Sequence, residues 1–230
     1  MNAEYIKDYK DKELKQFVVV YFLVAVAAVG FYELSSVKTI GMLSALFEMI
    51  TIDIFVGAIS VLVTILNELW PDKAKTKIVY KNMPSDSVFS EIATGKVDAT
   101  GFDLEKAKTM YSHLAEASAN RQTAEWNLML KKSRDEQLGN VVEAERMQLM
   151  TRDICISTVS LLIMNLVALL LLTIIFSNFG GAIKILGIPL VYLAIMFFIT
   201  RGAARNRASR FVMLVIKNEV QRELCKSNKQ

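Results

Sequence analysis

"ICISTVSLLIMNLVALLLLTIIF", from Ile154 to Phe176, is the stretch that decides the fold, because it contains no charged residue. A helix needs about 20 apolar residues to cross the hydrocarbon core of a bilayer. Backbone N–H and C=O groups cannot stay unpaired in lipid, and the stretch is too long for a barrel strand. It therefore predicts a transmembrane helix.

Three other stretches have the same apolar character, in a chain that is 53% hydrophobic with a mean hydropathy of +0.35. We predict an all-α integral membrane protein with four transmembrane helices, and with an insert that is helical between the second and third. The predicted segments are a basic arm over 1–16, spans over 17–34, 40–70, 154–177 and 182–200, an insert over 71–153 and a basic tail over 201–230.

The orientation follows from the positive charges. Of the 27 lysines and arginines, only two lie on the side opposite the rest: Lys38 in the loop between the first two spans, and Lys184 at the start of the fourth span. Positive charge accumulates on the cytoplasmic side of membrane proteins. Both termini and the insert are therefore predicted to be cytoplasmic.

The second span carries two carboxylates, Glu48 and Asp53, inside an otherwise apolar stretch. An ionised side chain costs roughly 2.5–3.5 kcal/mol at a membrane-helix centre. In one interpretation both lie at the wet outer end of the span and have no further role. In the other they face a water-filled axis between subunits, where a ring of carboxylates attracts cations. The two side chains lie about 140° apart around a helix, so both cannot point straight at the axis, and the deeper Asp53 is the favoured residue. Asn67 and Glu68 would then line the cytoplasmic end of the same pore.

Polar residues elsewhere in the spans have simpler interpretations. A buried asparagine between apolar helices usually makes an interhelical hydrogen bond, and we expect this of Asn165. The chain has one histidine, His113, and two cysteines that match no metal motif. We find no catalytic constellation, so we predict no enzyme activity and no cofactor.

The insert contains basic residues that lipid headgroups explain unequally. Cations beside the spans, such as Lys73 and Arg152, fit attraction to anionic headgroups. A second cluster, formed by Lys131, Lys132 and Arg134, lies about 20 residues from the third span, roughly 30 Å along a helix. For this cluster an anionic ligand such as a nucleotide is an alternative, with an aromatic ring available to stack on a base. The candidate ligand-binding residues are Lys131, Lys132, Arg134, Arg121, Trp126, Lys77 and Lys81.

Local signals predict several helices in the insert and tail. "MPSDSVFSEIATG" indicates a short helix capped by Ser85 or Asp86 and stopped by Gly95. A second helix is capped by Asp103. A long helical pattern runs from Arg121 into the third span, with Gly139-Asn140 as its weak point. The tail continues the fourth span as a helix, and its apolar run Phe211–Ile216 is expected to pack on the insert or on a neighbouring subunit.

Several motifs give the chain a resemblance to a known group. "MPSDSVF", Tyr111 followed by "AEWNLMLKK", and "MQLMTRD" immediately before the third span resemble small four-span bacterial membrane effectors of antiphage defence. Such proteins are encoded beside nucleotidyltransferase-like enzymes, as in cyclic-oligonucleotide systems and the Hailong system. The resemblance implies an oligomeric, channel-like effector of the bacterial inner membrane, regulated by a nucleotide-type ligand, with a nucleotidyltransferase-like protein as possible partner.

Two functions remain open from the sequence. The first is a homo-oligomeric pore, with a tetramer favoured, that is lined by the second span, regulated through the insert, and depolarises the membrane. A four-helix subunit is too small to enclose a conduction path alone, and closed cyclic symmetry is common among oligomers. The alternative is a membrane-anchored scaffold or sensor whose insert and tail recruit a cytoplasmic partner without conducting ions.

Overall fold

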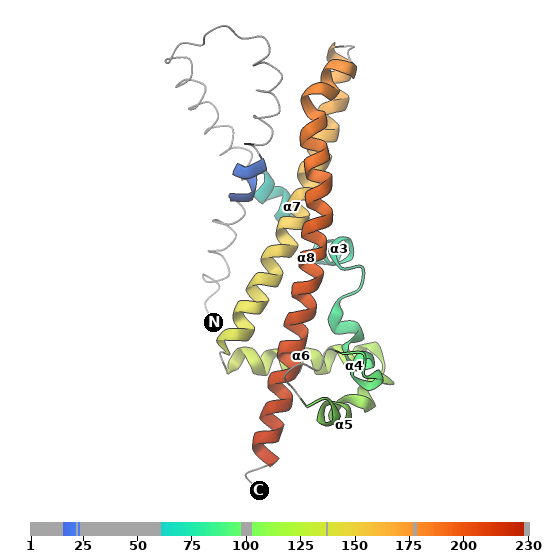
Figure 1. The fold of residues 1–230 in the computed structure, drawn as a ribbon, viewed down its shortest axis with the longest axis vertical. Helices are drawn as coiled ribbons and strands as arrows, with labels where there is room; N and C mark the ends of the chain where they lie inside the picture. Colours follow the sequence, from blue (N-terminus) through green and yellow to red (C-terminus); the bar gives the residue numbers. More distant parts are fainter. Residues whose placement is uncertain are drawn as a thin grey trace. The chain divides into compact units, whose positions relative to one another are not determined.

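The computed structural model describes residues 16–21, 23, 61–97, 103–136, 138–176 and 179–227. Within these ranges all regular secondary structure is helical, which confirms the all-α prediction for the described part of the chain (Figure 1). Helical segments at 16–21 and 61–69 come first. They are followed by α3 (Asp72–Val79), α4 (Pro84–Thr94), α5 (Leu104–Ala115), α6 (Ala119–Asp135), α7 (Gly139–Phe176) and α8 (Phe179–Ser227).

Two of the described helices are long and apolar enough to cross a membrane. These candidate spans are Gly139–Ile174 in α7 and Leu186–Lys226 in α8, and the spans predicted over 154–177 and 182–200 fall on these two helices. The spans predicted over 17–34 and 40–70 lie largely outside the described residues. The total of four spans therefore stays a prediction.

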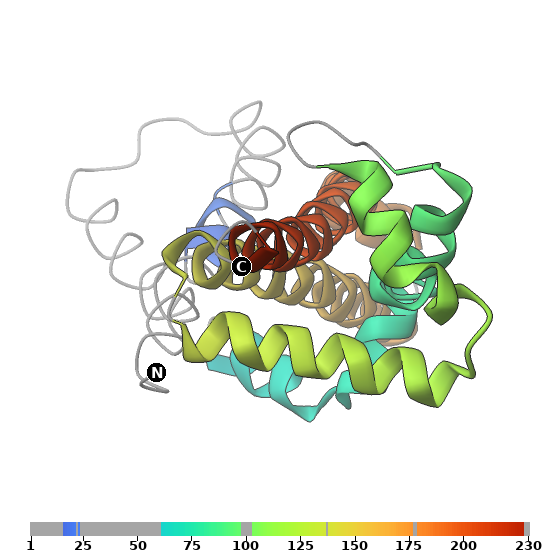
Figure 2. The same ribbon diagram turned by 90° about the horizontal axis from the view of Figure 1, so that it is seen from below.

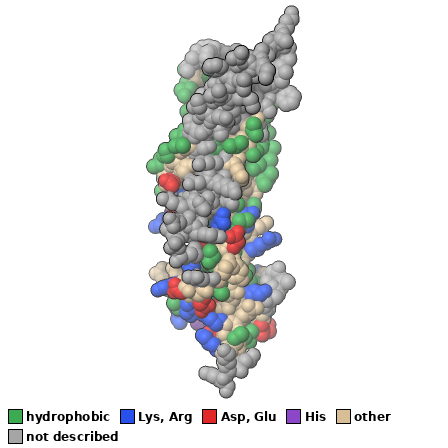
Figure 3. Space-filling view, turned by 90° about the vertical axis from the view of Figure 1, so that its left-hand side faces the viewer, with side chains coloured by type: hydrophobic (Ala, Val, Ile, Leu, Met, Phe, Trp, Pro, Cys, Tyr) green, Lys and Arg blue, Asp and Glu red, His purple; other side chains and the backbone are tan. Residues whose placement is uncertain are grey.

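The chain divides into two compact units, which we describe separately. The insert–tail unit contains residues 76–151 and 202–230, together with 1–2, and the apolar unit contains residues 3–75 and 152–201. In the face drawn in Figure 3, hydrophobic side chains gather in one region, while lysine, arginine, aspartate and glutamate side chains gather in another.

The insert–tail unit is built around one hydrophobic core. In it α4 packs against α5 and α6, and Figure 2 shows these three helices together. The apolar run Phe211–Ile216 contributes to this core, with Val215 and Ile216 fully buried. The prediction that this run packs on the insert is thus confirmed. The insert residues of the core are Val88, Phe89, Ile92, Ala107, Tyr111, Leu114, Trp126, Met129 and Val141.

The boundaries of α4 show how local chemistry sets a helix. Gly95 ends the helix in the left-handed conformation with φ 69°, as predicted. The predicted N-cap is wrong, because Met83 occupies that position and Pro84 follows as the first helical residue. Proline has a fixed φ that suits the first turn, so the helix begins before Ser85. Asp86 instead accepts a hydrogen bond from the backbone N–H of Met83 at 3.1 Å.

The other helix ends follow the same rules. Asp103 caps α5 as predicted, because its carboxylate accepts a hydrogen bond from the backbone N–H of Lys106 at 3.0 Å. The uninterrupted helix predicted from Arg121 is wrong, since α6 ends at Asp135 and α7 begins at Gly139. Glycine is a weak helix former, so the long pattern breaks beside it. From Gly139 the chain continues as one helix to Phe176.

The apolar unit has a smaller core. Its buried members are Phe17, Val18, Tyr21, Val63, Leu161 and Leu193. Large apolar side chains on α7 and α8 stay exposed, with Leu170 at 63%, Ile174 at 73% and Phe198 at 69% of their surface. Such a surface is costly in water but suits the hydrocarbon of a bilayer or a neighbouring apolar helix.

Candidate functional site

The candidate pore residues divide into two sets. Glu48 and Asp53 lie outside the described residues. Asn67 and Glu68 belong to the helical segment 61–69, where Asn67 is only 2% exposed and Glu68 is exposed. The segment therefore turns the amide of Asn67 into the apolar unit and presents the carboxylate of Glu68 outward.

The outward face of this segment contains more than Glu68. Val61 and Ile65 are also exposed, at 59% and 50%. Residues three and four apart share one side of a helix, so Val61, Ile65 and Glu68 form a single stripe. We call these three residues the outward stripe. Its two apolar residues lie about one turn apart, and the carboxylate follows about one turn later.

Buried polar groups join the helices of the apolar unit. The amide of Asn165 donates to the Tyr21 hydroxyl at 2.6 Å, which confirms the predicted interhelical hydrogen bond. The indole N–H of Trp70 donates to Ser160 Oγ at 3.1 Å. Asn67 Oδ1, in contrast, is buried and accepts no hydrogen bond among the described residues.

Four charged side chains form a network where α3 begins and α7 enters the apolar unit. Lys75 Nζ lies 3.9 Å from Asp153 Oδ1, and these two side chains are 6% and 3% exposed. Arg152 contacts Asp153 at 3.2 Å and Asp72 at 3.4 Å. The network holds two positive and two negative groups. Lys75, Arg152 and Asp153 are largely buried, whereas the side chain of Asp72 is 83% exposed.

Two of the predicted ligand-binding cations make ion pairs inside the insert–tail unit. Lys132 contacts Glu219 at 3.3 Å, and Arg134 makes two hydrogen bonds to Glu145. Glu219 and Glu145 are nearly buried, with 6% and 8% of their whole-residue surface exposed. The hydrogen bonds to Glu145 raise the pKa of Arg134 above its ordinary value. Lys132 and Arg134 thus neutralise carboxylates that the core takes out of water.

Trp126 is also part of the core. Its residue surface is 9% exposed, and its ring makes a T-shaped contact with the ring of Phe211, with centroids 6.1 Å apart and planes at 87°. Stacking of this indole on a base therefore requires the core to open, and it stays a prediction.

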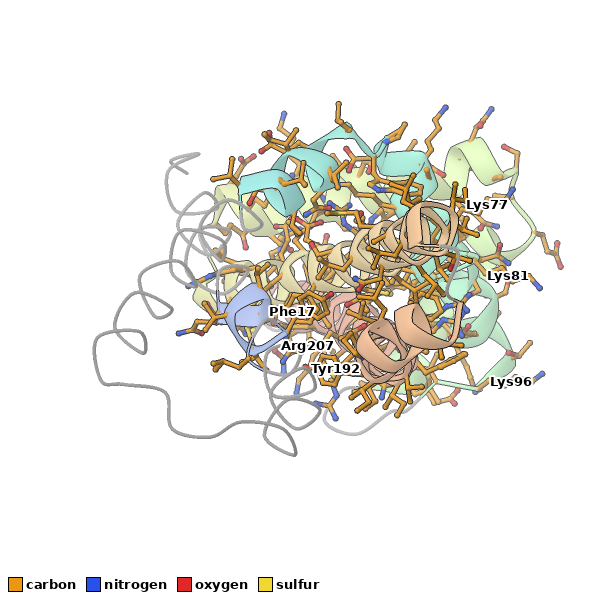
Figure 4. All side chains as sticks on the ribbon, turned by 90° about the horizontal axis from the view of Figure 1, so that it is seen from above. Phe17, Lys77, Lys81, Lys96, Tyr192 and Arg207 are labelled. Carbon is orange, nitrogen blue, oxygen red and sulfur yellow. The ribbon has the colours of Figure 1, made fainter. Side chains whose placement is uncertain are left out.

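The remaining predicted cations, Arg121, Lys131, Lys77 and Lys81, are exposed. In Figure 4, Lys77 and Lys81 project on the same side of the view as Lys96, another exposed lysine of the insert–tail unit. Lys81 has a φ of 70°, a left-handed conformation at the turn that follows α3. These side chains are accessible to an anion, whereas Lys132 and Arg134 already contact carboxylates.

The tail arginines bind the insert. Arg205 donates to the backbone carbonyl of Val79 at 3.1 Å, and Arg207, labelled in Figure 4, donates to Thr151 Oγ1 at 2.7 Å. Sequence reasoning assigned neither these contacts nor the buried carboxylates Glu145 and Glu219. The partners are up to 126 residues apart, so no local spacing indicates them.

Comparison of the chain with protein-family models, with curated proteins and with solved structures finds no match.

Proposed function

We propose that the protein is a homo-oligomeric ion channel of the bacterial inner membrane, with four spans per subunit and cytoplasmic termini. The outward stripe is the observation that carries this proposal. An exposed carboxylate at the end of an apolar helical face is costly against lipid and favourable against water. Several copies around a common axis supply that water, and Glu68 then lies at the cytoplasmic mouth of the pore.

Asp53 and Glu48 extend the proposed lining by sequence. In the orientation favoured by the positive charges, they lie toward the outer end of the second span. Carboxylates at both mouths would concentrate cations and exclude anions. We therefore propose a cation-selective pore, with a tetramer as the favoured assembly.

Flux through reconstituted vesicles tests the conduction. We expect the purified protein to release a cation gradient faster than an anion gradient. Asp53→Asn combined with Glu68→Gln should reduce this preference, because the ring charge is removed. Glu116→Gln is the matched control, since Glu116 is an exposed acid of the insert–tail unit that lies outside the proposed lining. A protein that is monomeric in detergent, or that conducts nothing, would overturn the proposal.

We further propose that an anionic nucleotide or oligonucleotide regulates the channel through the insert–tail unit. The accessible cations Arg121, Lys131, Lys77 and Lys81 would make the first contacts. Displacement of Lys132 or Arg134 from its buried carboxylate would then loosen the core. By resemblance, a nucleotidyltransferase-like protein would supply the ligand during phage infection, and membrane depolarisation would arrest growth.

Thermal unfolding with a panel of linear and cyclic oligonucleotides tests the regulation. Arg121→Ala combined with Lys131→Ala should reduce the ligand-induced shift, because two of the four proposed contacts are lost. The melting temperature of the free protein should not change, because both side chains are exposed. An unchanged shift in the double variant would contradict this assignment.

The scaffold alternative has less support. Its main sequence feature was the apolar run Phe211–Ile216, a candidate surface for a partner. Four residues of this run are buried in the core of the insert–tail unit, namely Phe211, Val212, Val215 and Ile216. The run is therefore already covered within the chain, and we favour the pore.

A further inference from the structure

An apolar groove of about 320 Å³ opens on the apolar unit where the second span ends. One wall comes from Leu66, Leu69, Trp70 and Pro71, and the other includes Ser160 and Ile163 of α7. We propose that this groove binds an acyl chain of an anionic phospholipid and that Lys73 contacts the headgroup of the same lipid. The proposal rests on the membrane placement of these helices and not on ion conduction.

The lining selects a hydrocarbon ligand. Its two polar side chains satisfy one another, because the indole N–H of Trp70 donates to Ser160 Oγ. The other lining side chains are apolar, so a polar ligand would lose hydrogen bonds to water without gaining replacements. An acyl chain loses none.

The rim of the groove is open to the surroundings of the helix. Leu69 is 70% exposed and Ile163 is 45% exposed. Ile163 lies within the candidate span of α7, so its surroundings in a membrane are lipid chains. Tryptophan is enriched at the boundary between hydrocarbon and headgroups, which places Trp70 near that level. A lipid chain can therefore enter from the bilayer while its headgroup stays at the surface.

The charges beside the groove favour an anionic headgroup. Lys73 follows Pro71 by two residues, is exposed, and forms no ion pair among the described residues. The neighbouring Lys75 and Arg152 contact Asp153 and Asp72, so their charges are balanced. Lys73 thus provides positive charge that the neighbouring carboxylates do not neutralise.

Quenching of tryptophan fluorescence by brominated lipids tests the proposal. The chain has two tryptophans, so Trp126→Phe leaves Trp70 as the only reporter. The variant is reconstituted in phosphatidylcholine vesicles that contain a low fraction of brominated phosphatidylglycerol or of brominated phosphatidylcholine. We expect the anionic lipid to be enriched up to about fivefold near Trp70, the effect of one lysine at an anionic surface. High salt should weaken this preference.

Two further variants separate the contribution of the acyl chain to lipid binding from that of the headgroup. Lys73→Gln should equalise quenching by the two brominated lipids, because it removes the charge and leaves the groove. Ile163→Phe should lower quenching by both lipids, because it fills the groove. Ile174→Phe is the matched control, since Ile174 is an exposed residue of α7 outside the lining. Equal quenching by both lipids before Lys73 is changed, or equal effects of the two phenylalanine variants, would overturn the proposal.

Discussion

At the scale of single residues, the two partners of the Arg134–Glu145 pair are not equivalent. The carboxylate side chain of Glu145 is 11% exposed, whereas the guanidinium side chain of Arg134 is 46% exposed. Removal of one partner is costly mainly when the charge left behind is buried. The two single substitutions should therefore differ in effect.

We expect Arg134→Met to destabilise the protein by about 3 kcal/mol or more, because it leaves a buried carboxylate without its partner. Glu145→Gln should cost only about 1 kcal/mol, since the arginine that remains can be hydrated. Thermal unfolding of the full-length protein in detergent, followed by circular dichroism, measures both. Equal losses of stability in the two variants would contradict the prediction that the burial of Glu145 makes the difference.

A second prediction concerns Tyr111, which is 5% exposed and whose hydroxyl has no hydrogen-bond partner among the described residues. Burial, together with the negative charge of Glu219, raises the pKa of Tyr111 above its ordinary value of 10.0. The folded state therefore holds this proton more tightly than the unfolded state. The associated stability is complete below the unfolded pKa and is lost as pH rises toward the folded one.

Tyr111→Phe should leave stability near pH 7 unchanged or slightly improved, because it removes a buried hydroxyl without a partner. The variant should also lose less stability than the wild type between pH 9 and about pH 11, where unfolded tyrosine ionises. Unfolding midpoints at the two pH values measure the difference. The same alkaline loss in both proteins would contradict the prediction.

At the scale of helices, α8 stabilises the insert–tail unit through one buried face. Ile216 is fully buried in this core, and its replacement by alanine should cost about 2–5 kcal/mol. Ser209→Ala on the exposed side of the same helix is the control and should change stability by less than about 0.5 kcal/mol. Protease resistance and the melting temperature report the loss. A loss of stability as small as that of the control would mean that the packing of α8 contributes little to the stability of this core.

The charge network between α3 and α7 makes a different element-scale prediction. Asp153→Asn should destabilise by roughly 3–5 kcal/mol, because the buried Lys75 loses the negative charge of its contact with Asp153. The double variant Lys75→Met with Asp153→Leu should regain most of that stability, since a buried pair can be replaced by apolar groups at little cost. A double-mutant cycle on melting temperatures gives the coupling. Additive losses would mean that the 3.9 Å contact contributes nothing.

At the scale of the whole molecule, apolar periodicity and helix-cap residues predicted those features of the fold that depend on local sequence. The helical class, the Asp103 cap, the Gly95 stop and the continuation of the fourth span as a helix depend on neighbouring residues, and the structure confirms them within the described ranges. The N-cap of α4 was missed because Pro84 moved the helix start. The apolar periodicity that continues past Gly139 favoured an unbroken helix, although Gly139-Asn140 is the weak point of that pattern, and the break falls immediately before it.

The candidate site was less predictable, because its contacts are long-range. A basic cluster looks the same in sequence whether it binds a ligand or neutralises buried acids. Lys132 and Glu219 are 87 residues apart, and Arg134 pairs with Glu145 across a helix break. Asn67 is buried and Glu68 is exposed because one side of the helical segment 61–69 packs within the apolar unit. The spacing of residues in the sequence does not indicate which side of that helix is packed.

The hydrogen bond between Tyr21 and Asn165 has a consequence for biosynthesis. Its two residues are 144 positions apart, so the ribosome adds Asn165 roughly 7–30 s after Tyr21 at ordinary elongation rates. Throughout that interval the phenol must find water, a lipid headgroup or the insertion machinery as a temporary partner. In the proposed topology the first span therefore enters the bilayer before this polar contact exists, and the contact forms only after the later helix has been synthesised.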